Sequence, residues 1–129
     1  MADEELSFHI EEIPDADSVF MRAHRDYISD GELRPRVFRA QDGSMSVDWD
    51  KYSTPEATRQ RAKKNPENNA VIRMGVGGIR GIGNLDVKHS PELDNQAHSD
   101  VNLPDNGADL TELRVLLRRI AQIVLPLSA

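Results

Sequence analysis

Apolar and polar residues alternate in several short segments, the pattern of strands that bury one face. The clearest segment is 45–49, where Met45, Val47 and Trp49 share one face and the two residues between them share the other. The turn-forming pair Asp42-Gly43 precedes it, as expected for a hairpin. The same pattern predicts strands at 19–24, 70–76, 85–87 and 97–101, and an extended segment at 34–39.

Two other stretches carry the signals of helices. A Ser-Thr-Pro-Glu sequence at 53–56 combines a cap, a proline of the first turn and a capping glutamate, and it predicts a helix to about Lys64. Asp109 is the expected cap of a last helix, in which apolar residues recur at steps of three and four: Leu110, Leu113, Leu117, Ile120 and Val124. Together these elements predict an α+β fold: a mostly antiparallel sheet of five to six strands, one surface helix and one C-terminal amphipathic helix packed on the sheet.

The last helix has more apolar surface than a single packing face needs. Leu116, Ile123 and Leu127 lie beside the main stripe and widen it. One explanation is that this second side packs against loops of the same chain. The other is an interface, through which the helix associates with an unidentified protein partner or with a second copy of the chain.

Charge is distributed unevenly along the chain of 129 residues and net charge −6. Residues 1–17 contain seven acids and no Lys or Arg, whereas the remaining 112 residues contain 15 acids and 16 bases, a balance of +1. We therefore expect an acidic leader at 1–17 ahead of a single domain at 18–129. A short alternation of apolar residues at 6–10 also permits an edge strand within this leader.

Composition excludes several classes of site. The chain has no cysteine, which rules out disulfides, a thiolate nucleophile and zinc–thiolate sites, and which suits a cytoplasmic location. The longest apolar run, near 120–127, is too short to span a membrane. We do not expect nucleic acid as a partner, because the body of the chain lacks a strong basic excess with interleaved aromatic residues.

Five glycines at 75–83 follow a predicted strand, as a phosphate-binding loop would. The spacing departs from the dinucleotide fingerprint, because Arg80 stands where a glycine is required, and no Gly-Lys-Ser/Thr follows. We interpret the segment as a flexible strand connection and expect no cofactor. Anion binding by Arg73, Arg80 and loop amides is the alternative.

Histidines on or beside predicted strands are candidates for chemistry. His89, His98 and Asp100 could assemble a metal site, but their spacing matches no known ligand pattern, so structural roles are expected and no metal is predicted. A catalytic hypothesis instead combines Arg22, His24, Ser46 and His98. It requires a concave pocket on which these side chains converge.

Two resemblances accompany these patterns. The order FMRAH … RPRVFRAQDGSMSVDW … STPEA … HSPELDNQAHSDV, over residues 19–101, resembles uncharacterised small bacterial α+β proteins, with Met45 where leucine is expected. That resemblance implies a related fold and transfers no catalytic residue. A looser one is to ADP-ribosyltransferase-type folds, including NAD-degrading RES toxins, in which Arg, Ser and Glu surround an NAD cleft. Arg22, Ser46 and Glu56 occur here in that order, although Glu56 also fits a capping role.

The sequence thus leaves two functions open. The first is a non-catalytic interaction or accessory protein of a bacterial cytoplasmic system, which binds a protein partner. The alternative is a small enzyme that acts on NAD, a nucleotide or another phosphate-containing ligand, either ADP-ribosyltransferase-like or metal-dependent. A convergent polar pocket favours the enzyme, whereas an exposed apolar or charged face favours the binding protein.

Overall fold

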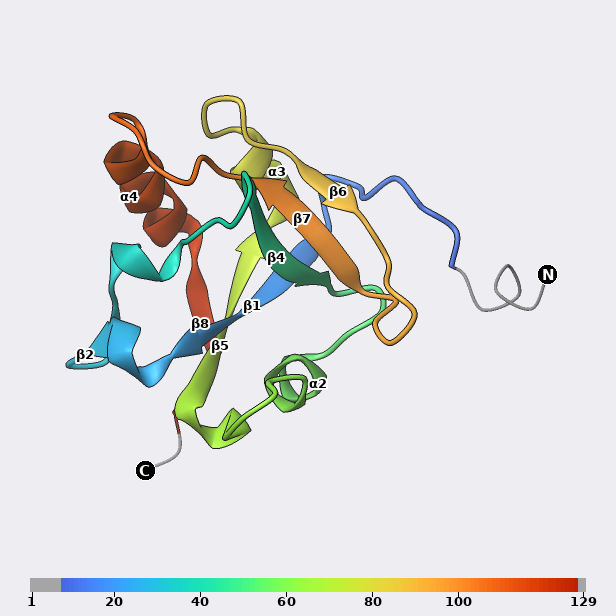
Figure 1. The fold of residues 1–129 in the computed structure, drawn as a ribbon, viewed down its shortest axis with the longest axis horizontal. Coiled ribbons are helices and arrows are strands. Elements are labelled where there is room, and N and C mark those ends of the chain that lie inside the picture. Colours follow the sequence, from blue (N-terminus) through green and yellow to red (C-terminus); the bar gives the residue numbers. More distant parts are fainter. Residues whose placement is uncertain (1–7, 128–129) are drawn as a thin grey trace.

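A computed structural model describes residues 8–127 and contains a six-stranded antiparallel sheet of order β6-β7-β4-β1-β5-β8 (Figure 1). The strands are β1 (Ser18–His24), β4 (Ser44–Trp49), β5 (Asn69–Gly75), β6 (Val87–His89), β7 (His98–Asn102) and β8 (Gln122–Leu125). The helices among the described residues are α2 (Pro55–Gln60), α3 (Val76–Arg80) and α4 (Leu110–Ile120). A small hairpin, β2 (Ile28–Ser29) with β3 (Glu32–Leu33), and the 3-10 turns η1 (Arg25–Tyr27), η2 (Pro35–Val37) and η3 (Pro66–Asn68) complete the chain. The predicted α+β class is confirmed.

The two faces of the sheet have different coverings. One face packs on α3, α4 and η2, and its strands contribute buried apolar side chains such as Met21, Val47 and Ile72. The opposite face carries α2, which contacts β1, β5 and β8. In Figure 1, α3 and α4 lie at the top of the view and α2 at the bottom. Because α2 has only six residues, the half of this face formed by β4 and β7 retains room for a cleft.

The C-terminal helix is shorter than the sequence predicts. It ends at Ile120, Ala121 is extended, and the next four residues form β8 on the outer edge of β5. Pairing with the backbone of β5 and the β-branched Ile123 and Val124 favour a strand here. Leu116 and Ile123 therefore do not share a helix face; each is partly buried against the core, and Leu127 follows β8. Whether these residues form an interface stays a prediction.

Four smaller expectations are also wrong. Residues 35–37 form the 3-10 turn η2 instead of continuing an extended segment, because proline is well tolerated in a first helical turn. The helix that begins after Thr54 ends at Gln60, and Thr54 accepts a hydrogen bond from the Ala57 backbone, which leaves no reciprocal capping role for Glu56. Asp109 precedes α4 but its side chain makes no capping hydrogen bond.

The glycine-rich segment after β5 forms a short helix, α3, and not the expected loop. A Cβ atom at Gly77 would lie 3.1 Å from the Asp15 carbonyl oxygen, and one at Gly78 would lie 3.3 Å from Ile120. The Gly77 amide also donates to that Asp15 oxygen at 2.9 Å. The glycines thus allow the N-terminal segment and α4 to approach the helix closely.

A pair of alanine substitutions tests this explanation. Gly77→Ala is expected to destabilise the fold by about 1–3 kcal/mol, because the new methyl group meets the Asp15 backbone. Gly75→Ala is the control, since Gly75 has φ −70° and no atom lies within 4 Å of its added Cβ. It should be neutral or stabilising by about 0.4–1 kcal/mol. Equal urea midpoints for the two variants would contradict the explanation.

Part of the acidic leader packs against the sheet. Ile13 is 2% exposed, and Asp17 accepts a hydrogen bond from the Trp49 indole at 2.9 Å. Residues 1–7 lie outside the described part of the chain, and the strand expected at 6–10 is not present in its described residues, 8–10. The boundary at residue 17 stays a prediction, with the added finding that residues 13–17 contact the domain.

Candidate functional site

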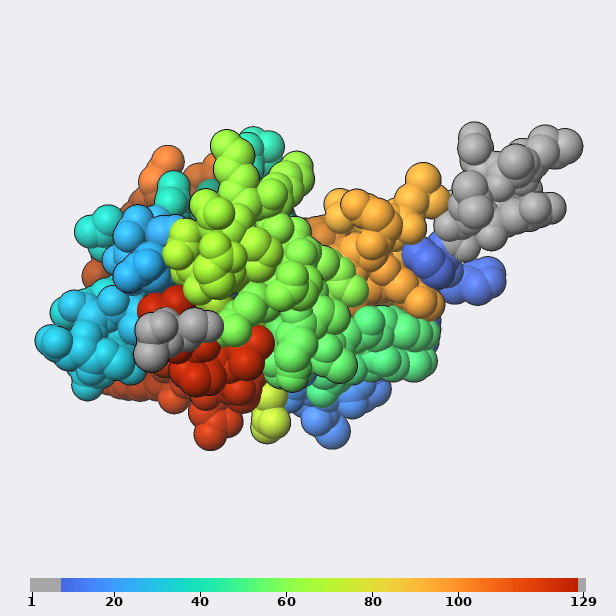
Figure 2. All heavy atoms as spheres, turned by 90° about the horizontal axis from the view of Figure 1, so that it is seen from below, coloured from blue at the N-terminus to red at the C-terminus, as the bar shows by residue number. Residues whose placement is uncertain are grey.

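A cleft of about 400 Å³ lies between α2, the strands β1 and β4, and the loop that leads into β7. Figure 2 views the molecule from below and shows the green α2 region beside the orange residues of that loop. Antiparallel pairing sets Asp48 opposite both Phe20 and His98, so side chains of three strands emerge on this same face. Polar residues of the lining include Arg22, Ser46, Asp48, Arg61, Lys63 and His98.

Asp48 anchors the cleft. Its side chain is buried, although the alternation in β4 predicts a solvent-facing residue, because α2 covers it. One carboxylate oxygen accepts hydrogen bonds from Thr58 Oγ1 and from the Arg61 guanidinium, both at 2.8 Å. The other accepts from Asn95 Nδ2 at 2.9 Å. A single carboxylate therefore joins β4 to α2 and to the loop before β7.

The hydrogen bonds of His98 determine which ring nitrogen carries the proton when the ring is neutral. Nδ1 lies 2.8 Å from the Ser90 carbonyl oxygen, which can only accept, so the proton is assigned to Nδ1. Nε2 is then an acceptor, and the exposed Ser46 hydroxyl lies 3.2 Å from it. Ser46 can donate its proton to this nitrogen, as a serine paired with a general base does.

Charges in the cleft are mixed. Arg22 donates to the Thr58 carbonyl at 2.9 Å, and Lys63 is exposed. Glu92 and Asp94 line the cleft from the loop side, whereas the charge of Arg61 is offset by Asp48. The cationic groups available for an anionic ligand are therefore those of the first pair, Arg22 and Lys63.

The structure brings together three of the five catalytic candidates. Arg22, Ser46 and His98 line the cleft. His24 does not, and its Nδ1 accepts from the Asp26 amide at the start of η1. Glu56 is exposed on the first turn of α2 and lies outside the lining, so the Arg–Ser–Glu arrangement of the looser resemblance is incomplete in this cleft.

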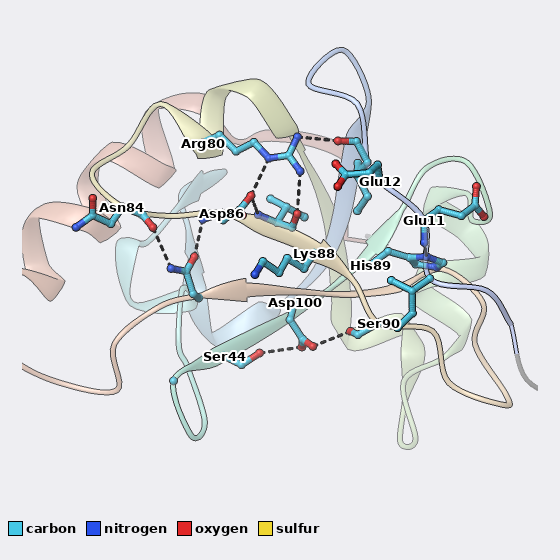
Figure 3. Close-up of a pocket in the computed structure, with 15 residues that line it drawn as sticks. Glu11, Glu12, Ser44, Arg80, Asn84, Asp86, Lys88, His89, Ser90 and Asp100 are labelled. Carbon is cyan, nitrogen blue, oxygen red and sulfur yellow. Dashed lines mark hydrogen bonds and ion pairs between the residues drawn. The ribbon is translucent and has the colours of Figure 1, made fainter.

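A second, larger cavity of about 890 Å³ lies between residues 10–13, β6 and β7 (Figure 3). Arg80 lines it and donates to the Ile13 and Val87 carbonyls and to the carboxylates of Asp15 and Asp86, at 2.7–2.9 Å. The hydrogen bond with Asp15 raises the pKa of Arg80, and Arg80 lowers that of Asp86. These contacts give Arg80 a structural role, and Arg73 does not line this cavity, so anion binding by the two stays a prediction.

His89 also has a structural environment. It is 4% exposed, accepts from the Glu11 amide at 3.0 Å and donates to the Gln96 carbonyl at 2.8 Å. The Glu11 carboxylate binds Lys51 and Tyr52, and the hydrogen bond from Lys51 lowers the pKa of Glu11. His89 pairs with Ser99, so it emerges on the sheet face opposite to that of His98. Among residues 8–127, no group of three or more His, Asp or Glu is placed to hold a metal ion.

Sequence reasoning missed most of the residues that orient the candidates. Asp48, Thr58 and Asn95 fix the cleft walls, and Ser90 adjoins His98. Asp100 was named beside His98 as a possible metal ligand, and a residue two positions from His98 on a strand does lie on the same face. For Ser90, in the loop after β6, periodicity offers no such signal.

Comparisons with protein-family models, curated proteins and solved structures give no match. The resemblance to small bacterial α+β proteins thus stays a prediction based on motifs, and function has to be argued from the cleft itself. Among residues 8–127, no helix is both long and apolar enough to cross a membrane.

Proposed function

We propose that the chain is a small enzyme that acts on a phosphate-containing ligand in the cleft beside α2. The observation that carries the proposal is the convergence of Arg22, Ser46 and His98, which lie on three strands, at one cavity. Its volume of about 400 Å³ is within the range of small-ligand sites, about 300–1,000 Å³.

The proposed roles follow from the chemistry of each side chain. Ser46 and His98 supply a hydroxyl and an imidazole whose Oγ and Nε2 lie 3.2 Å apart, a pair suited to proton transfer. Arg22 and Lys63 supply positive charge, and a guanidinium can bind two phosphate oxygens at once. The ligand would lie between these cations and the Ser46–His98 pair.

The competing hypothesis is that the chain is a non-catalytic interaction protein, and one observation that supported it no longer holds. It relied on a two-sided apolar helix at the C-terminus, but the residues after Ile120 form β8, and Leu116 and Ile123 pack against the core. A protein partner for this chain stays a prediction. The convergent cleft is the stronger physical support, so we favour the enzyme.

Ligand-induced stabilisation tests the proposal with AMP, ADP-ribose and inorganic pyrophosphate as probes. A probe that binds only the folded protein, and whose free concentration is about 100 times its dissociation constant, stabilises the fold by about 2.7 kcal/mol. This raises the melting temperature by several degrees. We expect such a rise with at least one probe and its loss in Arg22→Gln. The control is Arg25→Gln, because Arg25 is exposed on η1 and outside the cleft. No rise with any probe, or an equal rise in Arg22→Gln, would overturn the proposal.

A further inference from the structure

We infer that Ser46 is a nucleophile toward phosphorus, activated by a hydrogen-bonded chain that runs through His98 and Ser90 to Asp100. This inference rests on the proposed function, because it names the reacting atom of the same cleft. Ser46 is exposed on β4, whereas Ser90, His98 and Asp100 are partly buried. The hydroxyl is therefore open to a ligand while its activating groups are held by the protein.

The direction of each hydrogen bond follows from what each atom can donate. Asp100 Oδ2, as a carboxylate oxygen, accepts from Ser90 Oγ at 2.6 Å. Since that hydroxyl has only one proton, Ser90 Oγ accepts from His98 Nδ1 at 3.0 Å, and Nδ1 also donates to the Ser90 carbonyl. His98 Nε2 then accepts from Ser46. Figure 3 shows Asp100 between Ser90 and Ser44, whose hydroxyl binds the other carboxylate oxygen at 2.8 Å.

This arrangement favours transfer of a proton from Ser46 to His98. The imidazolium that forms is stabilised by Asp100 through Ser90, and the Glu92 carboxylate lies 4.0 Å from Nε2. Asp100 Oδ1 lies at the same distance from Nε2. Across the cleft are the cations Arg22 and Lys63, which oppose the positive charge on His98 but attract the anionic electrophile. Asp94, on the loop wall, adds negative charge beside Glu92.

The reaction step balances without another reactant. Ser46 Oγ bonds to phosphorus of a phosphoester, its proton passes to His98 Nε2, and the bond from phosphorus to the leaving oxygen breaks. His98 then returns the proton to that oxygen, which leaves as an alcohol. A phosphoserine at position 46 remains. Water then attacks its phosphorus while His98 Nε2 takes the proton of the water, the bond from phosphorus to Ser46 Oγ breaks, and His98 returns the proton to Oγ as the phosphate leaves.

Diisopropyl fluorophosphate tests the nucleophile directly, because an activated serine displaces fluoride from its phosphorus atom and retains the phosphoryl group. We expect mass spectrometry of the wild-type chain to locate one adduct on Ser46. His98→Gln should lower the labelling rate by about 10²- to 10⁴-fold, the usual contribution of a general base. Ser29→Ala, on β2 and outside the cleft, should label at the wild-type rate.

Ser90 and Asp100 are positioning residues, and rescue by a conservative variant identifies the role of Ser90. Asp100→Asn should lower the labelling rate, because the imidazolium that forms loses a stabilising negative charge. Ser90→Ala should behave in the same way, and Ser90→Thr, which keeps the hydroxyl, should restore most of the rate.

The failure of this inference and that of the proposed function are distinguishable. No adduct on Ser46, or an unchanged rate in a His98→Gln variant whose circular dichroism is native, would overturn the nucleophile even where AMP still raises the melting temperature. An adduct on Ser46 with the expected loss in His98→Gln would support the nucleophile even where no phosphate probe binds. In that case only the proposal that the ligand contains phosphate would be contradicted.

Discussion

Replacing Asp48 with alanine is expected to lower the free energy of unfolding by about 3–5 kcal/mol, the range for removing one partner of a buried ion pair. Asp48 is 6% exposed and accepts from Thr58, Arg61 and Asn95. Its loss removes the shared acceptor of these three donors, of which Thr58 and Arg61 keep Ser53 Oγ as a partner, and it removes the bonds that hold α2 on β4. The effect combines a lost ion pair with the loss of hydrogen bonds to a buried carboxylate.

Urea unfolding at neutral pH measures this change, and Ser46→Ala is the matched control on the same strand. Ser46 is exposed, so its truncation should alter stability by no more than about 0.5 kcal/mol. If Asp48→Ala were as stable as Ser46→Ala, α2 would not depend on this carboxylate, and the cleft wall would have another origin.

Truncation of Leu117 to alanine is expected to cost about 2–5 kcal/mol, the range for a buried leucine. Leu117 is the one fully buried leucine of α4 and joins the cluster between the helix and the sheet. Truncating its side chain leaves a cavity between α4 and the sheet, which α4 and the sheet cannot fully close by shifting toward each other. The loss should appear as a lower urea midpoint with an unchanged slope.

The same chemical change at an exposed position is the control for Leu117. Leu93 is 68% exposed in the loop before β7, and Leu93→Ala should shift stability by no more than about 0.5 kcal/mol. Equal stabilities of the two alanine variants would show that α4 is not packed on the sheet as described.

The strands of the sheet could be predicted because their alternation is local. Met45, Val47 and Trp49 are buried as the period of two requires, and the turn at Asp42-Gly43 has the positive φ angles of a tight hairpin. The C-terminal region could not be predicted in the same way. Its apolar residues continue the helical period past Ile120, and the preference of the β-branched Ile123 and Val124 for a strand becomes decisive only beside the open edge of β5.

The glycine segment shows the same limitation. Glycine has a low helix propensity, so the sequence favours a loop after β5. Asp15 and Ile120, from opposite ends of the chain, pack closely on α3 and stabilise a helix that local preference opposes. Contacts between residues so distant in sequence cannot be derived from a period.

Part of the candidate site could be predicted as well. The sequence places Arg22, Ser46 and His98 on three separate strands. Their side chains reach the same cleft only because of the register in which β1 pairs with β4 and β4 pairs with β7. A slip of one residue would move each side chain to the other face. The sequence contains no comparable signal for the packing of α2 over Asp48, which gives the cleft its second wall.

Chemical-shift mapping with a phosphate probe tests most directly whether the cleft beside α2 is the functional site. Titration of ¹⁵N-labelled protein with AMP should move the backbone amide signals of Arg22, Ser46 and His98 in a saturable manner, and Arg22→Gln should abolish these shifts. The larger cavity beside residues 10–13 provides an internal comparison, and its lining residues Glu12 and Lys88 should remain unaffected. Shifts confined to that second cavity, or no saturable shifts at all, would contradict the assignment of the site.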